Sequence, residues 1–326
     1  MMSSETETAV TKGTPIPTGA LRLHMMIFAG LLAVLLVAPW FLYPVFLMKV
    51  LCFALFAAAL NLLLGFGGLL SFGHAAFFGL ASYVAAHTAK VWGFTPELAI
   101  LFGAGSAAVL GLGIGALAIR RQGIYFAMVT LAFAQMVFFF ALQVPFTGGE
   151  DGIQAVPRGK LFGLIDLAND LTLYFVVLAI VFGGLLLIYR IIHSPFGQAL
   201  KAIRDNEQRA MSLGYKVNHY KLAVFVMSAG LAGLAGATKA IVFQLASLSD
   251  VYWTMSGEVV LMTLLGGMGT IFGPIVGAAV IVTVQNYFAG FGAWVTVIEG
   301  VIFVVSVLLF REGIIGVLSR YLKKPL

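Results

Sequence analysis

The sequence predicts an all-helical protein that crosses a membrane many times. Hydrophobic residues make up 61% of the 326 residues and charged residues only 10%, and the mean hydropathy is +1.04. A water-soluble domain needs far more polar surface than this composition supplies. The chain also has 38 glycines, and small residues let helices in lipid approach one another closely. We expect about ten transmembrane helices, within a range of about eight to ten, some of them broken by glycine.

Residues 1–20 differ in composition from everything that follows. They are rich in Thr, Ser, Glu and Pro and have no apolar periodicity, so we expect a disordered cytoplasmic tail. They are not expected to be a signal peptide, because the next apolar run is too long and no small-residue cleavage site follows it. Residues 21–326 are then expected to form a single transmembrane domain.

Apolar runs of about 20 residues, long enough to cross a bilayer, follow one another closely. We place them at 23–43, 45–64, 72–89, 95–118, 122–142, 171–191, 222–245, 256–271, 272–290 and 293–310. One kinked span is the alternative for the first two, since only Pro39 to Pro44 separates them. Glycines and a proline also interrupt the pair between 256 and 290, so eight or nine spans remain an alternative.

The charges between these spans predict an orientation. If the N-terminus is inside, most of the Lys and Arg residues fall in inner segments, among them Arg120, Arg121 and Arg190. The outer segments then hold four cations: Lys49, Lys90, Arg158 and Lys160. Cytoplasmic loops carry the excess of Lys and Arg. Both termini and the loop 193–221 are therefore expected in the cytoplasm, and the loop Thr147–Ile153 outside. The same asymmetry explains the net charge of +6 without a nucleic-acid partner.

The segment Arg190–Lys221 is too charged to lie in a bilayer core. Ser194 and Pro195 predict a helix start, and apolar residues then recur with helical spacing at Phe196, Ala199, Leu200 and Ile203. Asp205 with Gln208 predicts a capping box for a second short helix that ends at Gly214. Two short amphipathic helices need a surface to pack against. That surface is either a partner protein or the membrane itself.

Motifs for enzyme chemistry are absent from the sequence. The five histidines have no zinc-ligand spacing, and the single cysteine, Cys52, lies in an apolar run. Gly159-Lys160 is followed by leucine and lacks the upstream glycine of a phosphate-binding loop. No Gly-x-Ser-x-Gly motif is present either. We expect no catalytic residues, no metal site and no cofactor bound by this chain.

Two glycine-rich stretches, Gly65–Gly79 and Gly266–Gly277, place polar residues within predicted spans. Irregular backbone at membrane depth is tolerated beside a cavity or inside protein, and transporters use broken helices to build substrate sites. We therefore predict a substrate path lined by Ser71, Gly73, His74, Gly266, Gly267, Gly269 and Thr270. In the alternative, these glycines serve only to pack helices.

Three ionisable residues fall within predicted spans: Lys239, Glu258 and Glu299. Glu258 is expected near the outer end of its span and in contact with water. Lys239 and Glu299 are expected at similar depth, so they could form a buried pair. Intramembrane charges mark functional sites by default, although a purely structural pair or a snorkelling lysine fits equally well.

Four motifs together resemble a known family. Asn61 with GFGGLLSFGHAAFFGLASY, then TGGEDGI, SPFGQALKAIRDNEQRAMSLGY and LLGGMGTIFGPIVGA, occur in order between about residues 50 and 311. The chain resembles the LivM-type permeases of bacterial branched-chain amino acid importers, in the ATP-binding cassette superfamily. The resemblance implies a bacterial inner-membrane importer with a second homologous permease, two cytoplasmic ATPases that bind ATP, and an external solute-binding protein.

The resemblance also implies a role for the loop 193–221, because in the superfamily a Glu-Ala-Ala…Gly pattern forms coupling helices that dock on the ATPase. Glu207 and Gly214 hold the outer positions of that pattern, and Ala210 matches one alanine. Arg209 departs from it, since it stands in place of the other alanine. The expected coupling residues are Arg204, Asp205, Glu207, Ala210 and Gly214.

Other functions remain open at this level. Related permeases import urea, amides or other amino acids, so the substrate is not settled. A secondary transporter would need a titratable relay, for which Lys239 and Glu299 are the candidates. A membrane-embedded enzyme would need a nucleophile or a metal cluster, which the sequence lacks.

Overall fold

The computed structural model describes residues 18–292, 294–309 and 312–322. The predicted tail therefore lies almost wholly outside the described residues. Helices dominate the described part: α1 (Thr18–Val37), α2 (Pro44–Asn61), α3 (His74–Lys90), α4 (Pro96–Ala118), α5 (Ile124–Gln143), α6 (Asp170–His193), α7 (Pro195–Asp205), α8 (Glu207–Ser212), α9 (Val217–Phe243), α10 (Trp253–Gly266), α11 (Gly273–Tyr287), α12 (Trp294–Leu309) and α13 (Gly313–Leu322). The expected helical membrane architecture is confirmed.

Short 3-10 turns and strands connect these helices. The 3-10 turns are η1 (Ala38–Trp40), η3 (Pro145–Thr147), η4 (Gly149–Asp151), η5 (Leu248–Asp250) and η6 (Ala289–Phe291), while η2 (Leu62–Phe66) is a turn of π-helix. Strand β1 (Ile153–Gln154) pairs antiparallel with β4 (Leu245–Ala246). Strand β2 (Lys160–Leu161) pairs antiparallel with β3 (Ile165–Asp166).

Five helices are long and apolar enough to cross a membrane. They are Pro44–Phe66, Pro96–Ala118, Ile124–Gln143, Asp170–His193 and Val217–Phe243. Shorter apolar helices cover His24–Trp40, Gly273–Tyr287 and Trp294–Val305. The predicted count of about ten spans is thus not confirmed by length and composition. Glycine-rich breaks are the physical reason, because they leave α3 with 17 residues, α10 with 14 and α11 with 15, against the roughly 20 of a full span.

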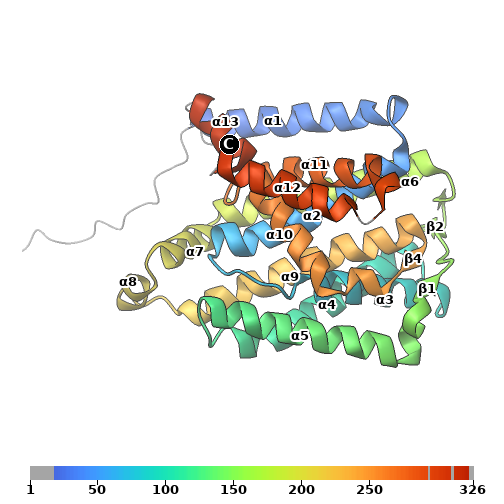
Figure 1. Cartoon of the computed structure of the whole chain (residues 1–326), viewed down its shortest axis with the longest axis horizontal. Helices are drawn as coiled ribbons and strands as arrows, with labels where there is room; N and C mark the ends of the chain where they lie inside the picture. Colours follow the sequence, from blue (N-terminus) through green and yellow to red (C-terminus); the bar gives the residue numbers. More distant parts are fainter. Residues whose placement is uncertain (1–17, 293, 310–311, 323–326) are drawn as a thin grey trace, which may run out of the picture.

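The long helices run side by side and define two ends of the molecule (Figure 1). Helices α7 and α8 project from one end, here called the loop end, and α13 lies at the same end. The short strands gather at the opposite end, here called the strand end. The predicted polar loop is therefore separated from the predicted outer loops by the full length of the bundle.

Close backbone contacts hold the centre of the bundle together. A Cβ atom on Gly103 of α4 would lie 2.7 Å from the Ala81 carbonyl of α3, and one on Gly236 of α9 would overlap the carbonyl of Phe78. Most of helix α2 is buried, and it packs against α6, α9, α10 and α11. Because lipid offers no hydrophobic expulsion between helices, such small-residue contacts supply the packing energy.

The loop helices largely follow their prediction. Ser194 caps α7 by accepting a hydrogen bond from the Gly197 N–H at 3.3 Å. The predicted cap of the second helix was wrong by one residue, because Asn206 accepts from the Arg209 N–H at 2.9 Å. Asp205 instead ends α7 and pairs with Arg204 at 3.0 Å. Gly214 follows α8 with a φ of +87°, the left-handed conformation that favours glycine.

The intramembrane charges have partners that the sequence did not predict. Lys239 Nζ lies 2.6 and 2.7 Å from the carboxylate oxygens of Asp250 in η5, at the strand end. Glu258 accepts a hydrogen bond from Gln285 Nε2 at 3.1 Å. The side chain of Glu299 lies outside the described residues. Among the residues that are described, the partner of Lys239 is thus Asp250, in the turn that follows β4.

Candidate functional site

The two predicted glycine-rich stretches meet at Asn61, the last residue of α2. Asn61 Nδ2 donates to the Thr270 carbonyl at 2.7 Å, and its Oδ1 accepts from the Gly269 N–H at 2.9 Å. After Asn61 the chain makes the π turn η2 and then runs without helix until α3 begins at His74. One buried amide therefore joins the break between α2 and α3 to the break between α10 and α11.

The glycines of the second break are required by its geometry. Gly267 has a φ of +125° and Gly269 a φ of +77°, values that other residues rarely adopt. A Cβ on Gly266 would overlap the Gly273 carbonyl, so α10 and α11 touch through their backbones. Thr270 is half-buried; its Oγ1 donates to the Gly267 carbonyl at 2.7 Å and accepts from the Gly273 N–H at 3.1 Å. These four predicted path residues thus build the turn itself.

The first break lies against α5. The Gly73 N–H donates to Ser71 Oγ at 3.1 Å, and the Phe72 N–H donates to Thr130 Oγ1 of α5 at 3.2 Å. Ser71 and Gly73 are buried within this chain, whereas Leu70 beside them is exposed. The side chains that the sequence predicted as path lining therefore face protein here, and their exposed neighbours are apolar.

His74 is the buried first residue of α3. Its Nε2 lies 2.8 Å from Ser228 Oγ, and that hydroxyl donates to the Ala59 carbonyl at 2.5 Å. Because the hydroxyl hydrogen is used on Ala59, His74 Nε2 must carry the hydrogen in its own bond to Ser228. A π turn leaves one carbonyl of the preceding helical turn without its usual partner, and Ser228 of α9 supplies a donor at that level. His74 and Ser228 thus hold α2, α3 and α9 in one register.

Helix α7 reaches the first break through Arg204. Arg204 Nη1 donates to the Gly65 carbonyl at 2.5 Å, and Lys201 Nζ lies 5.6 Å from the centre of the Phe66 ring. A Cβ on Gly68, whose φ is +69°, would lie 2.8 Å from Arg204 Cγ. Burial, with a contribution from the Arg204 charge, lowers the pKa of the Lys201 ammonium. The loop and the break are therefore in direct polar and apolar contact.

Glu207, the predicted coupling glutamate, faces its own chain. It accepts from Lys221 Nζ at 2.7 Å and from Gln122 Nε2 at 3.0 Å. The Lys221 side chain is only 7% exposed, so this is a largely buried ion pair. Ala210 is buried with Ile203 and Val217. Apolar and aromatic side chains are exposed at Met211, near the end of α8, and at Leu213 and Tyr215 just after it.

A family model described as "Branched-chain amino acid transport system / permease component" matches residues 43–309. The chain belongs to this permease family. The predicted resemblance is confirmed, and the family is one of transport components rather than enzymes. With its apolar helices, the permease is a multi-pass membrane protein.

Curated relatives agree with this family. The permease is 29% identical over 287 residues to the high-affinity branched-chain amino acid transport system permease protein LivM of Escherichia coli, covering 81% of this chain and 68% of the relative. It is 28% identical to LivM of Salmonella typhimurium over the same shares. It is also 28% identical to the ribose import permease protein RbsC of Bacillus subtilis, over 68% of this chain and 70% of the relative. No solved structure matches the permease significantly.

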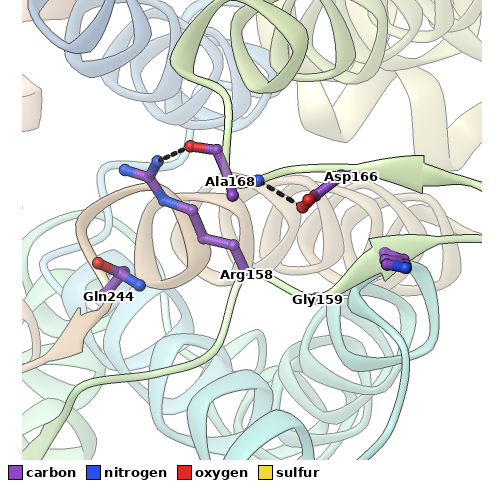
Figure 2. A pocket seen from close by; sticks show the side chains of 6 residues that line it. Arg158, Gly159, Asp166, Ala168 and Gln244 are labelled. Atoms are coloured by element: carbon purple, nitrogen blue, oxygen red, sulfur yellow. Dashed lines mark hydrogen bonds between the residues drawn. The ribbon is translucent and has the colours of Figure 1, made fainter.

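The strand end of the permease carries a separate pocket of about 410 Å³, with charged residues in its lining (Figure 2). It is lined by Arg158, Gly159, Lys160, Asp166, Ala168 and Gln244. Arg158 pairs with Asp170 at 2.7 Å and donates to the Val242 carbonyl at 3.1 Å. The arginine therefore ties the segment between α5 and α6 to the start of α6 and the end of α9. Among the described residues no group of three or more His, Cys, Asp or Glu side chains could hold a metal ion.

The sequence interpretation did not assign functional roles to Asn61, Thr130, Lys221 or Ser228. The signal for Asn61 was available, because an amide is conspicuous in a helix as apolar as α2 and polar residues within membrane spans need partners. Nothing local signalled Ser228 or Thr130. Their partners lie 169 and 58 residues away in sequence, so only the packed bundle identifies them.

Proposed function

We propose that this chain is a permease subunit of an ATP-binding cassette importer that moves branched-chain amino acids into the cytoplasm. The family match over residues 43–309 carries the proposal, and the two LivM relatives support the substrate class. A carrier for leucine-like substrates needs a mainly apolar passage with few polar groups. The exposed Leu70 and Met268 beside the two breaks fit that need.

We further propose that the permease works with a second homologous permease, two cytoplasmic ATPases and an external solute-binding protein. The sequence has no phosphate-binding loop, so ATP must be bound by partner subunits. At the loop end, Met211 of α8 and Leu213 and Tyr215 just after it form an exposed apolar edge, here called the α8 edge. An apolar helix edge outside the membrane is the kind of surface that docks in a groove of a partner. In this proposal it meets the ATPase, while Arg204, Asp205, Glu207, Ala210 and Gly214 keep that edge in place.

The proposed orientation places the loop end in the cytoplasm and the strand end outside, because most cations lie at the loop end. Helices α1 to α6 and α9 to α12 then cross alternately, which gives about ten passes, several of them shortened by breaks. The substrate path runs beside the first break, at Ser71, Gly73 and His74, and beside the second, at Gly266, Gly267, Gly269 and Thr270. Backbone groups and exposed neighbours, rather than the buried Ser71 and His74 side chains, would meet the substrate.

Reconstitution tests this function. The purified chain alone in proteoliposomes should show no uptake of labelled leucine, isoleucine or valine. Addition of the sister permease, the ATPases and the binding protein should give ATP-dependent uptake of these three. Uptake of ribose or urea instead would reassign the substrate. Uptake by the lone chain driven by a proton gradient would contradict the importer and favour a secondary transporter.

A further inference from the structure

Arg204 lies at the point where the polar loop touches the irregular part of α2. The last carbonyls of any helix lack partners within that helix, and Gly65 belongs to the final turn, η2. Arg204 Nη1 supplies the missing donor at 2.5 Å. Its aliphatic stem covers Gly68, where a side chain would collide with it. The guanidinium also bears a positive charge, which is favourable at a helix C-terminus.

The same contact extends to the second break. The space that a Cβ on Gly269 would occupy lies 4.0 Å from Arg204 Nη1 and 3.5 Å from the Gly65 carbonyl. Gly269 is itself held by the Asn61 side chain. The loop, the α2–α3 break and the α10–α11 turn therefore meet at the Gly65 carbonyl.

Helix α7 is suited to pass on a displacement. Its inner face is buried at Ala199, Leu200 and Ile203, and its start is capped by Ser194. A capped, packed helix moves as a unit, whereas a hydrogen bond weakens steeply when its angle departs far from linear. A small shift of α7 would consequently change the hydrogen bond between Arg204 and the Gly65 carbonyl first.

We propose that Arg204 is the positioning residue that ties movement of the cytoplasmic loop to both glycine breaks, through its hydrogen bond to the Gly65 carbonyl. This inference rests on the proposed importer function and specifies how its loop acts on the path. In the structure the bond ties α7 to the Gly65 carbonyl, which lies next to Gly269 of the second break. When α7 moves, the carbonyl is released or carried along, and the segments 65–73 and 267–272 change their exposure together.

The test uses the complete importer complex in proteoliposomes, with all signals expressed per assembled complex. Arg204→Met keeps the apolar stem over Gly68 and removes the donors, while Arg204→Lys keeps one cationic donor. Arg120→Ala is the matched control, because Arg120 is an exposed arginine at the turn between α4 and α5. The two readouts are leucine uptake per ATP hydrolysed and the rate at which a cysteine at position 268 reacts with a water-soluble thiol reagent, with and without ATP.

We expect Arg204→Met to lower uptake per ATP by about tenfold or more, the effect of losing one charge-assisted hydrogen bond. ATP should no longer change labelling at position 268 in that variant, Arg204→Lys should be intermediate, and Arg120→Ala should match the wild type. Wild-type uptake per ATP in Arg204→Met, with normal ATP-dependent labelling, overturns the inference while leaving the importer function intact. A wild-type complex without ATP-driven uptake overturns the importer function itself.

Discussion

Asn61 shows how one side chain can make an irregular turn tolerable inside a membrane protein. The backbone of the α10–α11 turn lacks the ladder of a helix, so its N–H and C=O groups need other partners. Asn61 supplies one donor and one acceptor, to Thr270 and Gly269, and both of its own polar atoms are satisfied in return. The amide is therefore a structural requirement of the second break rather than a group awaiting substrate.

This assignment predicts the effect of Asn61→Leu, which has similar volume and no polar atoms. The Thr270 carbonyl and the Gly269 N–H would lose their partner, and each unsatisfied buried group costs about 1–3 kcal/mol. We expect a lower thermal unfolding midpoint in detergent and loss of uptake by the assembled complex. Asn286→Leu, at an exposed site near the strand end, should change neither. An unchanged midpoint in Asn61→Leu would show that the two bonds are dispensable.

At the scale of elements, the Glu207–Lys221 pair sets the position of α8. It joins the start of α8 to the second turn of α9, and Gln122 adds a contact from the turn before α5. The resemblance led us to expect a coupling role for Glu207. In the structure Glu207 pairs with Lys221 of its own chain, so a coupling role would act through this pair. Glu207 would then position the exposed α8 edge, and Met211, Leu213 and Tyr215 would make the contact itself.

A charge exchange tests this element. Glu207→Lys leaves two buried cations together, and Lys221→Glu leaves two carboxylates; breaking a buried pair costs about 3–5 kcal/mol. Each single variant should lose ATPase association, measured by co-purification, and ATP-driven uptake. The double variant should recover most of both, because the pair is restored in reverse. If Glu207 instead contacts the ATPase directly, the double variant will remain as defective as Glu207→Lys alone.

Local signals predicted elements well where a short stretch of sequence decides them. Ser194-Pro195 correctly predicted the start of α7. Gly214 correctly predicted the end of α8, and its positive φ is the conformation that favours glycine there. The cap of α8 was misplaced because Asp205 and Asn206 are both good caps, and only the turn geometry selects Asn206. Lys239 could not be paired from sequence, since its partner depends on how residues 244–250 fold back over the end of α9.

At the scale of the whole molecule, the structure shows which side chains at the two breaks are buried and which are exposed, and the sequence could not show this. Hydropathy predicts that glycines interrupt apolar runs, but it does not reveal which side of a break faces neighbouring helices. Ser71 and His74 point into the bundle, while Leu70 and Met268 are exposed. A path along this chain would therefore be lined by the apolar neighbours of the polar residues, which suits the hydrophobic side chain of leucine.

Single cysteines in a Cys52→Ala background test this surface, since Cys52 is buried and free. Cysteines at Leu70 and Met268 should react with a water-soluble thiol reagent in the assembled complex, because a substrate path must be wet in at least one state. The reaction rates should change with ATP or with the loaded binding protein. A cysteine at Ser71 should stay unreactive, since that side chain is packed inside the protein.

Val109 provides the control: it is 72% exposed in the middle of α4, where a lipid-facing position should resist the reagent. Labelling at Val109 equal to that at Leu70 and Met268 would mean that exposure alone, and not a path, explains the reactivity. Failure of both positions to react in every state of an active complex would place the path elsewhere on the permease.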